Sequence, residues 1–312
     1  MKIVFMGTPD FAEKSLEAVY NAGHEILAVV TNPDRPKGRG MKMVASPVKE
    51  FAVSKNLKIY QPEKVRKNVE FIEEIKKLEP DVICVVAYGK ILPKEILEIP
   101  KLGCINVHGS LLPKYRGSAP IQWAVINGEK VTGVTTMYMD VGMDTGDMIL
   151  KEETEIAPDE TTGELWDRLA KIGADLLVKT LEQIENKTAP RIPQGEDFSM
   201  APMLDKEMSK IDWESKTAQE IKNLVRGLNP IMGTYAYLNG KKIKIWKVDV
   251  VKANSEDTKN GTVLKSDSKD GLYIKAKDGV IKVLEIQGEN AKRMNIQDFL
   301  RGNQIEVGSI FE

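Results

Sequence analysis

Cysteine and histidine are scarce in this chain of 312 residues, which contains only two of each. Both cysteines, Cys84 and Cys104, lie inside apolar segments, where we expect buried, reduced thiols. No CxxC pair and no cluster of histidine with cysteine occurs, so we do not expect a metal site. No apolar run reaches the roughly 18 residues of a membrane-spanning helix, and the first residues lack the apolar core of a secretory signal. We therefore expect a cytoplasmic protein that does not associate with a membrane.

Common nucleotide and hydrolase motifs are also missing. The first apolar run, residues 2–7, is followed by GTPDFA instead of GxGxxG, and Pro9 removes one backbone N–H from that turn. A dinucleotide pyrophosphate would need such N–H groups, so this turn does not predict a dinucleotide site. The absence of a GxxxxGK[ST] loop and of a GxSxG turn argues against a P-loop nucleotide site and an α/β-hydrolase serine.

Charge is unevenly distributed along the chain, although the net charge is only −1. Residues 1–205 contain 26 Lys and Arg against 31 Asp and Glu, whereas residues 206–312 contain 19 against 15. The carboxy-terminal third is therefore mildly basic, which is compatible with a polyanionic partner. A lysine-rich solvated surface would give the same balance, so charge alone does not identify the partner.

Strand and helix patterns alternate through the first 190 residues. The runs at 3–6, 26–30 and 82–87 are apolar almost without interruption, which is typical of strands covered by helices on both faces. One helical pattern separates the first two runs, and two more, starting near Ser46 and near Asn68, come before the third. This order predicts an α/β fold with a Rossmann-like, doubly wound and mostly parallel sheet.

The end of this first domain is marked by a loss of periodicity. Residues 133–140 and 146–156 have the pattern of a β pair that closes the sheet, and a long helix follows at about 161–186. Residues 187–205 contain three prolines and no periodic pattern, and we interpret them as a linker. The first domain is therefore expected to span residues 1–186.

Residues 206–312 have a different character. Asn239-Gly240 and Asp278-Gly279 separate alternating strand patterns, which predicts tight hairpins. Short strands of this kind suggest a small OB-like β-barrel, an architecture that often binds nucleic acid. We therefore expect a second, barrel-shaped domain over this range.

Asn106 and His108 lie at the end of the apolar segment GCINVHG (103–109). Residues two apart in a strand point to the same side, so the amide and the imidazole share a face. Both lie at the carboxyl end of a predicted parallel strand, where open α/β sheets bind ligands. There they could stabilise negative charge on a carbonyl oxygen or move a proton. The structural alternative is a hydrogen-bonded Asn–His pair that only caps the strand.

A carboxylate near the histidine would complete such a site. The segment MDVGMDTGDM (139–148) offers Asp140, Asp144 and Asp147, and its two glycines allow a backbone path that reaches into a crevice. A carboxylate there could orient the imidazole, raise its pKa or relay a proton from an attacking amine. The residue chemistry does not choose among the three aspartates, and a surface turn would have the same composition.

The segment NPDRPKGRGMKM (32–43) carries four cations within eight residues. These cations are Arg35, Lys37, Arg39 and Lys42. A basic loop with glycines and prolines suits contacts with a phosphate backbone, although a solvated basic loop has the same composition.

Several of these segments together resemble the methionyl-tRNA formyltransferases. In chain order they are MGTPDFA, PDRPKGRG, VVAYGKILP, CINVHGSLLPKYRGSAPIQWA and MDVGMDTGDM. The HGSLLPKYRG block is typical of enzymes that take a formyl group from 10-formyltetrahydrofolate. The resemblance covers essentially the whole chain, including IDW (211–213) and LNGKKIKIW (238–246). One departure is the segment Asn229–Met232, NPIM, where the family often has an aromatic-rich run.

The resemblance implies roles for particular residues. Asn106, His108 and Asp144 match the catalytic amide, imidazole and carboxylate. Arg39 matches the arginine whose loop reaches the acceptor stem of the tRNA, and His24 has no such role. The folate-binding stretch is matched by Ser110, Leu111, Leu112 and Pro113. The loop that binds tRNA is matched by Arg35, Lys37, Arg39 and Lys42.

The resemblance also implies the reaction. We expect a monomer that moves a formyl group, without a metal, from 10-formyltetrahydrofolate to the α-amine of methionine on initiator tRNA. A formyltransferase acting on a small amine, or a hydrolase of 10-formyltetrahydrofolate, could use the same three residues. A non-catalytic RNA-binding protein could share the fold. The basic loop and the second domain favour the tRNA enzyme.

Overall fold

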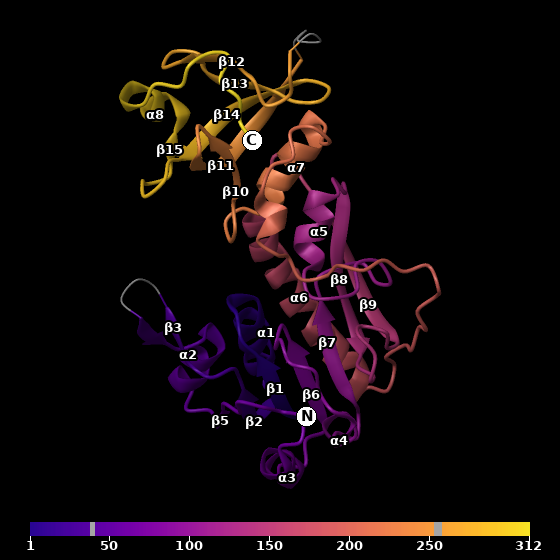
Figure 1. Cartoon of the computed structure of the whole chain (residues 1–312). Coiled ribbons are helices and arrows are strands. Elements are labelled where there is room, and N and C mark those ends of the chain that lie inside the picture. The colour runs from indigo at the N-terminus through magenta and orange to yellow at the C-terminus, as the bar shows by residue number, and fades with distance from the viewer. Residues whose placement is uncertain (38–40, 253–257) are drawn as a thin grey trace. The chain divides into compact units, whose positions relative to one another are not determined.

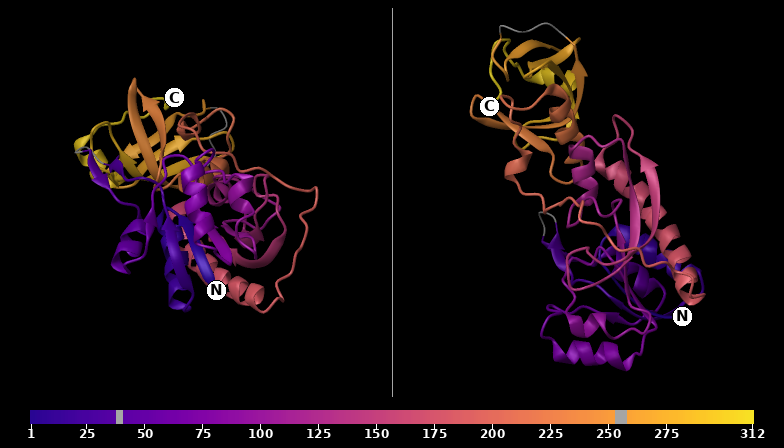
Figure 2. Two further views of the ribbon diagram at one scale, coloured as in Figure 1. Left: turned by 90° about the horizontal axis from the view of Figure 1, so that it is seen from below. Right: turned by 90° about the vertical axis from the view of Figure 1, so that its right-hand side faces the viewer.

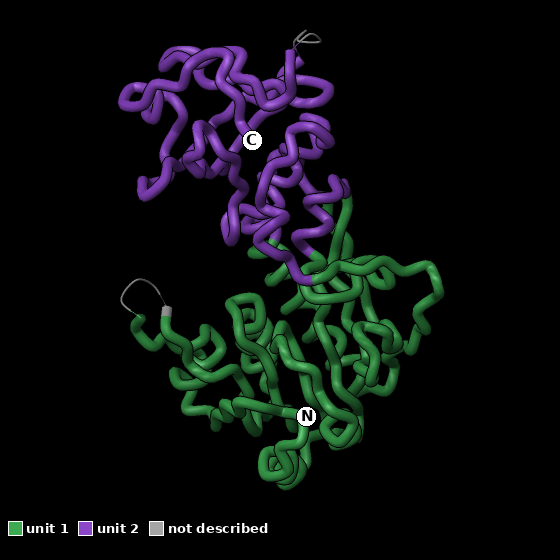
Figure 3. Tube along the Cα trace, in the orientation of Figure 1, with its two compact units in different colours: residues 1–120, 131–155, 166–202 green, residues 121–130, 156–165, 203–312 purple. Residues whose placement is uncertain are grey.

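The computed structural model describes residues 1–37, 41–252 and 258–312 (Figure 1, with two further views in Figure 2). The chain divides into two compact units (Figure 3). Unit 1 consists of residues 1–120, 131–155 and 166–202, and unit 2 of residues 121–130, 156–165 and 203–312. None of the described helices is long and apolar enough to cross a membrane.

Unit 1 is built on a seven-stranded sheet in the order β5-β2-β1-β6-β7-β8-β9. Its parallel strands are β1 (Lys2–Gly7), β2 (Glu25–Val30), β5 (Ile59–Tyr60), β6 (Val82–Val86) and β7 (Cys104–His108). At one edge, β8 (Val131–Tyr138) and β9 (Met148–Glu155) continue the sheet in antiparallel pairing. The Rossmann-like, mostly parallel sheet predicted from the sequence is therefore confirmed, with its closing β pair.

Helices cover both faces of this sheet. The first face carries α1 (Asp10–Asn21) and α6 (Thr162–Glu185), and the second carries α3 (Val69–Lys77) and α4 (Lys94–Leu97). On the first face, the rings of Phe11 and Trp166 meet edge to face at 5.2 Å. On the second face, Phe71 and Ile96 join a buried core with Ile83 of β6. The strands between these layers are apolar on both sides, which explains their uninterrupted hydrophobic runs.

Side-chain caps set the start of two helices of unit 1, α2 and α3, as their sequences predict. Ser46 accepts a hydrogen bond from the backbone N–H of Lys49 (3.1 Å) at the start of α2 (Pro47–Ser54), whose first residue is a proline. Asn68 accepts one from the N–H of Phe71 (3.1 Å) before α3. Each cap satisfies an N–H that the helix itself leaves without a partner.

Both cysteines are buried and free, as the sequence predicts. Burial raises the pKa of the Cys104 thiol to about 12, and burial also raises the pKa of Cys84. Both thiols therefore stay protonated and unreactive at neutral pH.

Unit 2 carries an antiparallel sheet in the order β10-β11-β14-β13-β12, with β15 paired to β14. Its strands are β10 (Thr234–Leu238), β11 (Lys241–Val251), β12 (Val263–Asp267), β13 (Gly271–Lys275), β14 (Val280–Gln287) and β15 (Met294–Asn295). Its helices include η1 (Glu207–Ser209), α7 (Ala218–Gly227) and α8 (Ile296–Gly302). The predicted hairpins at Asn239-Gly240 and Asp278-Gly279 join β10 to β11 and β13 to β14.

The carboxy-terminal residues are hydrogen-bonded at both edges of this sheet. The N–H of Phe311 donates to the carbonyl of Gly261 (2.8 Å), just before β12. Glu312 and Tyr237 of β10 exchange backbone hydrogen bonds of 2.7 and 2.8 Å. Residues 308–312 therefore link one edge of the sheet to the other.

Unit 2 also contains two segments from earlier in the sequence, residues 121–130 and 156–165. The buried Arg226 of α7 donates to the carbonyl of Val125 (3.5 Å), in α5 (Pro120–Ile126), and to that of Glu160 (3.2 Å). Burial lowers the pKa of this guanidinium. A Cβ on Gly227 would lie 2.4 Å from the Ile126 side chain, so α7 and α5 pack at close range.

The segment Asn229–Met232, where the sequence departs from the family pattern, has a structural role in unit 2. Asn229 is buried, and its amide donates to the carbonyl of Trp246 (3.0 Å) in β11. Its own carbonyl accepts from the N–H of Gly163 (3.1 Å). The segment thus ties β11 to the turn that starts α6.

Candidate active site

Strand β7 presents Asn106 and His108 on one face of its sheet. Cys104, on the same side of the strand, belongs to the core beneath α3 and α4. Val107, on the opposite side, lies against Gly173 of α6. Asn106 and His108 therefore face the α3–α4 side, and His108 is the last residue of the strand. The carboxyl end of a parallel strand is where ligand sites of this sheet type occur.

The imidazole of His108 is buried, with 5% of the residue exposed, and both ring nitrogens face polar groups. Nε2 lies 2.8 Å from the carbonyl oxygen of Tyr115. Because a carbonyl only accepts, Nε2 must carry the hydrogen in this contact. Nδ1 faces Oδ2 of Asp144 at 3.7 Å. In the neutral ring Nδ1 is therefore unprotonated, and its lone pair is on the side of the carboxylate.

Asp144 itself is held in an unusual backbone conformation. Its φ is +55°, a left-handed value that aspartate adopts more readily than most residues. Oδ2 accepts a hydrogen bond from the backbone N–H of Gly117 (2.8 Å). One carboxylate oxygen thus contacts both the loop after β7 and the imidazole of His108.

The structure separates the three aspartates that the residue chemistry left open. Asp140 accepts a hydrogen bond from Thr145 (2.7 Å) within its own loop. Asp147 lies 3.5 Å from the guanidinium of Arg191. Of the three, Asp144 is the one that the fold brings to the histidine.

The side-chain amide of Asn106 is available to a ligand. Across the described ranges, no residue forms a hydrogen bond with its half-buried side chain, so its two amide hydrogens are available. Large apolar side chains remain exposed on the loops after β6 and β8, with exposed fractions of 63% for Ile91, 76% for Val141 and 57% for Met143. Few polar groups beside apolar surface are typical of small-molecule sites.

The residues after α6 also contact the site, which the sequence patterns do not predict. The Gln194 amide donates to the backbone carbonyls of Asp144 and Gly146, both at 2.8 Å. The Ser199 hydroxyl accepts from the N–H of Tyr115 (2.9 Å). A single glutamine in a segment without regular structure leaves no periodic signal, so only its contacts identify it.

The segment Ser110–Pro113 turns into the protein directly after β7. Ser110 and Leu112 are fully buried, and Leu112 packs in a small cluster with two methionines. Lys151 donates to the carbonyl of Leu112, and burial lowers the pKa of this lysine. Leu111 and Pro113 keep partly exposed side chains.

The basic segment forms a short hairpin where the sequence suggests only a loop. β3 (Arg35–Lys37) pairs antiparallel with β4 (Lys42–Val44). Arg35 and Lys42 are exposed on these strands, and Arg39 lies outside the described residues. The hairpin therefore presents cations to solvent.

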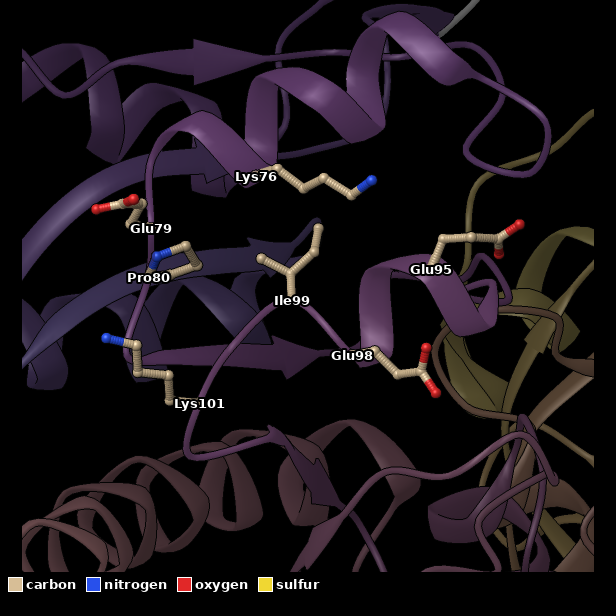
Figure 4. A pocket seen from close by; sticks show the side chains of 7 residues that line it. All are labelled: Lys76, Glu79, Pro80, Glu95, Glu98, Ile99 and Lys101. Carbon is tan, nitrogen blue, oxygen red and sulfur yellow. The ribbon is translucent and has the colours of Figure 1, made fainter.

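A separate pocket of about 490 Å³ lies beside the amino ends of the central strands β6 and β7 (Figure 4). It is lined by Lys76, Glu79, Pro80, Glu95, Glu98, Ile99 and Lys101. Pro80 and Lys101 come shortly before β6 and β7, so the pocket adjoins the amino ends of these strands and His108 lies at the other end. We therefore do not assign it to the candidate active site. Where the chain is described, no group of three or more His, Cys, Asp or Glu could hold a metal ion.

Comparisons with known proteins agree along the chain. The formyl transferase family matches residues 1–181, and the formyl transferase C-terminal domain matches residues 203–304. The methionyl-tRNA formyltransferase of Ruminiclostridium cellulolyticum is 51% identical over 310 residues, covering 99% of this chain and 98% of the relative. That of Clostridioides difficile is 54% identical over 311 residues, covering 99% of each chain.

Solved structures of lower identity share the fold. An N-formyltransferase from Helicobacter canadensis, in complex with folinic acid and dTDP-3-aminofucose, superposes with a TM-score of 0.65 at 21% identity, covering 94% of this chain and 100% of that one. HypX from Aquifex aeolicus, in complex with tetrahydrofolic acid, gives a TM-score of 0.66 at 16% identity. Its match covers 99% of this chain, which spans 50% of HypX.

Proposed function

The chain belongs to the methionyl-tRNA formyltransferases, and we propose that Asn106, His108 and Asp144 carry out its reaction. The enzyme transfers a formyl group from 10-formyltetrahydrofolate to the α-amine of methionine on initiator tRNA, in support of translation initiation. The observation that carries the residue assignment is the distance of 3.7 Å between His108 Nδ1 and Asp144 Oδ2, beside an available amide on the same strand face. All three residues belong to unit 1, so one copy of the chain contains the whole proposed catalytic set, and we propose that the enzyme is a monomer. We also propose that it is cytoplasmic.

The reaction exchanges one carbon–nitrogen bond for another. The amine nitrogen bonds to the formyl carbon, the bond from that carbon to N10 of the folate breaks, and one proton moves overall from the amine to N10. Negative charge develops on the formyl oxygen as the amine attacks. Asn106 donates an N–H to this oxygen, and His108 donates as well when Nδ1 is protonated. One such donor typically contributes about 10²–10³ in rate.

Asp144 handles the proton of the attacking amine. The amine becomes acidic as it bonds to the formyl carbon, and the Asp144 carboxylate accepts its proton with the help of His108 or a water molecule. The hydrogen bond from Gly117 keeps Oδ2 directed at the imidazole. The same carboxylate stabilises a positive charge on His108.

The folate donor fits the apolar surface and the loop after β7. Ser110 and Leu112 are buried, so contacts from Ser110–Pro113 would come from the backbone or from Leu111 and Pro113. The exposed Ile91 and Met143 offer apolar surface to a flat ring.

Residues 206–312 form the proposed tRNA-binding domain, joined by a linker at 187–205 to a catalytic domain at 1–186. The link that residues 308–312 make between the edges of the sheet in unit 2 supports an OB-like barrel. The excess of Lys and Arg in this domain favours a polyanion. The tRNA phosphates are also contacted by the basic hairpin, through Arg35, Lys37, Arg39 and Lys42.

A formylation assay tests the proposed function. With 10-formyltetrahydrofolate as donor, the acceptors are charged initiator Met-tRNA, charged elongator Met-tRNA, free methionine, or none. We expect rapid transfer to charged initiator tRNA. Folate turnover without an acceptor would indicate a hydrolase, and failure with every tRNA would indicate a small-amine formyltransferase.

A further inference from the structure

The segment 190–202, called the strap below, contacts both loops that hold the candidate active site. Ile192 and Met148 exchange backbone hydrogen bonds of 2.9 and 3.0 Å, which attach the strap to the start of β9. The carbonyl of Ser199 accepts from the N–H of Arg116 (2.8 Å), and the N–H of Ala201 donates to the carbonyl of Arg116 (2.6 Å). The strap therefore connects the end of the loop after β8 with the loop after β7.

Gln194 of the strap uses both ends of its side-chain amide. Nε2 donates to the carbonyls of Asp144 and Gly146, both at 2.8 Å. Oε1 accepts from Nε of Arg116 at 2.9 Å. A glutamine amide has two hydrogens to donate, and both are engaged by the loop that carries Asp144.

Arg116 fixes the orientation of this amide. The residue is only 8% exposed, and its guanidinium lies 4.5 Å from the ring centre of Phe198. Among the residues that the structure describes, Arg116 has no ion-pair partner. Its positive charge is instead stabilised by the neutral amide oxygen of Gln194 and the ring face of Phe198. A guanidinium only donates, which requires the oxygen of Gln194 to face Arg116 and its nitrogen to face the Asp144 loop.

The residues on either side of Arg116 hold the two catalytic partners. The carbonyl of Tyr115 accepts from His108 Nε2 (2.8 Å), and the N–H of Gly117 donates to Asp144 Oδ2 (2.8 Å). Gln194 binds Asp144 at its other end, through the backbone carbonyl. A left-handed aspartate persists when its surroundings hold it in place, and these contacts do so.

We propose that Gln194 is a positioning residue that, with Arg116, holds Asp144 at its working distance from His108. This inference rests on the proposed function, because it acts through Asp144. A displacement of about 1 Å in a reacting group can lower a rate by about 10²-fold. Loss of the Gln194 donors lowers kcat and leaves substrate binding nearly intact.

The test compares Gln194→Glu with Glu196→Gln in the full-length enzyme. Gln194→Glu keeps the size of the side chain and the oxygen that faces Arg116, but replaces the donating nitrogen. Glu196 is exposed and lies two residues further along the strap. We expect kcat of Gln194→Glu to fall about 10–100-fold, with KM for both substrates within about twofold. Unchanged kcat in Gln194→Glu, or an equal loss in Glu196→Gln, would overturn the proposal.

A double-mutant cycle with Asp144→Asn distinguishes positioning from general damage. If Gln194 acts through Asp144, adding Gln194→Glu to Asp144→Asn costs less than about threefold in the residual kcat. Losses that multiply would overturn the role.

Gln194→Met takes the place of Gln194→Glu if circular dichroism shows that the latter is misfolded. A wild type that formylates no charged tRNA would refute the proposed function itself, whereas an active wild type with an unaffected variant refutes the role of Gln194.

Discussion

One nitrogen of the His108 imidazole is already hydrogen-bonded within the protein when no substrate is present. Its Nε2–H is held by the carbonyl of Tyr115, so Nδ1, on the side of Asp144, is the nitrogen left for the proposed reaction. The neutral ring and the carboxylate have no hydrogen between them, and their separation of 3.7 Å is longer than a hydrogen bond.

Asp144→Asn should therefore lower kcat by about 10²-fold or more, because an amide neither accepts the proton of the amine nor stabilises a charged imidazole. The apparent KM for tRNA and for folate should change little. Asp147→Asn in the same loop is the matched control, since Asp147 only forms a partly exposed pair with Arg191. Steady-state formylation measures both variants, and a comparable loss in the control would contradict the assignment.

The other histidine, His24, predicts a pH effect on stability. Burial lowers its pKa below 6.5, and the positive amino group of Met1, 3.4 Å away, lowers it further, while Glu185 opposes them. The folded protein then binds fewer protons than the unfolded chain, so this contribution is present above pH 6.5 and is lost as the pH falls below that value. In urea unfolding at pH 7.5 and at pH 5, the wild type should lose more stability than His24→Gln. A constant difference between them would contradict this.

At the residue level, the sequence allowed part of the site to be predicted. Asn106 and His108 follow from the alternation of side chains at the end of an apolar strand. Asp144 could be chosen only through the family resemblance, since three aspartates share its loop. The three aspartates differ in their three-dimensional contacts, because only Oδ2 of Asp144 lies close to both the Gly117 N–H and the His108 imidazole.

Among the elements, long periodic segments were predicted well and short ones were not. Helix α6, with 24 residues, is long enough for its period to be clear, and the apolar strands are identified by their uninterrupted hydrophobic runs and not by their length. Helix α8 has seven residues, and the β3–β4 hairpin has three residues in each strand, too few to establish a period. The hairpins at Asn239-Gly240 and Asp278-Gly279 are short as well, but their turn residues identify them.

Two glycines in unit 2 separate the effect of backbone conformation from that of packing. Gly240 has φ +74° and Gly302, the last residue of α8, has no such positive φ, and neither has an atom that a Cβ would meet within 4 Å. Gly240→Ala should destabilise the protein by about 1 kcal/mol, because a Cβ disfavours the left-handed region. Gly302→Ala should be neutral or slightly stabilising. Denaturant midpoints compare them, and equal effects would show that the turn tolerates a side chain.

At the scale of the whole molecule, sequence order and spatial grouping differ. Residues 121–130 and 156–165 belong to the same compact unit as residues 203–312, whereas the strands that flank them in sequence belong to unit 1. Composition changes along the chain locate a boundary near residue 200, but they carry no information about contacts over long separations. The Arg226 guanidinium and the close approach of Gly227 to Ile126 are such contacts.

A chain ending at Pro202 should therefore be less stable than the full-length protein. It keeps every residue of unit 1 but loses α7, which leaves the carbonyls of Val125 and Glu160 without Arg226 and the apolar side of α5 uncovered. Thermal unfolding should show a lower midpoint, with increased binding of an apolar dye before the transition. In the full chain, Arg226→Met should shift the midpoint in the same direction, with the exposed Arg301→Met as its control. A truncated chain as stable as the whole would show that these contacts contribute little.

The contact between Arg226 and Val125 joins residues 101 positions apart, and this sets an order of events during synthesis. At about 5–20 residues per second, the ribosome takes roughly 5–20 s to add the residues between them. During that interval the strands of unit 1 can pair, but α5 cannot pack against α7, because α7 has not yet been synthesised. The last third of the chain thus contributes to folding before any tRNA is bound, because α7 completes the packing of α5, which is translated about 100 residues earlier.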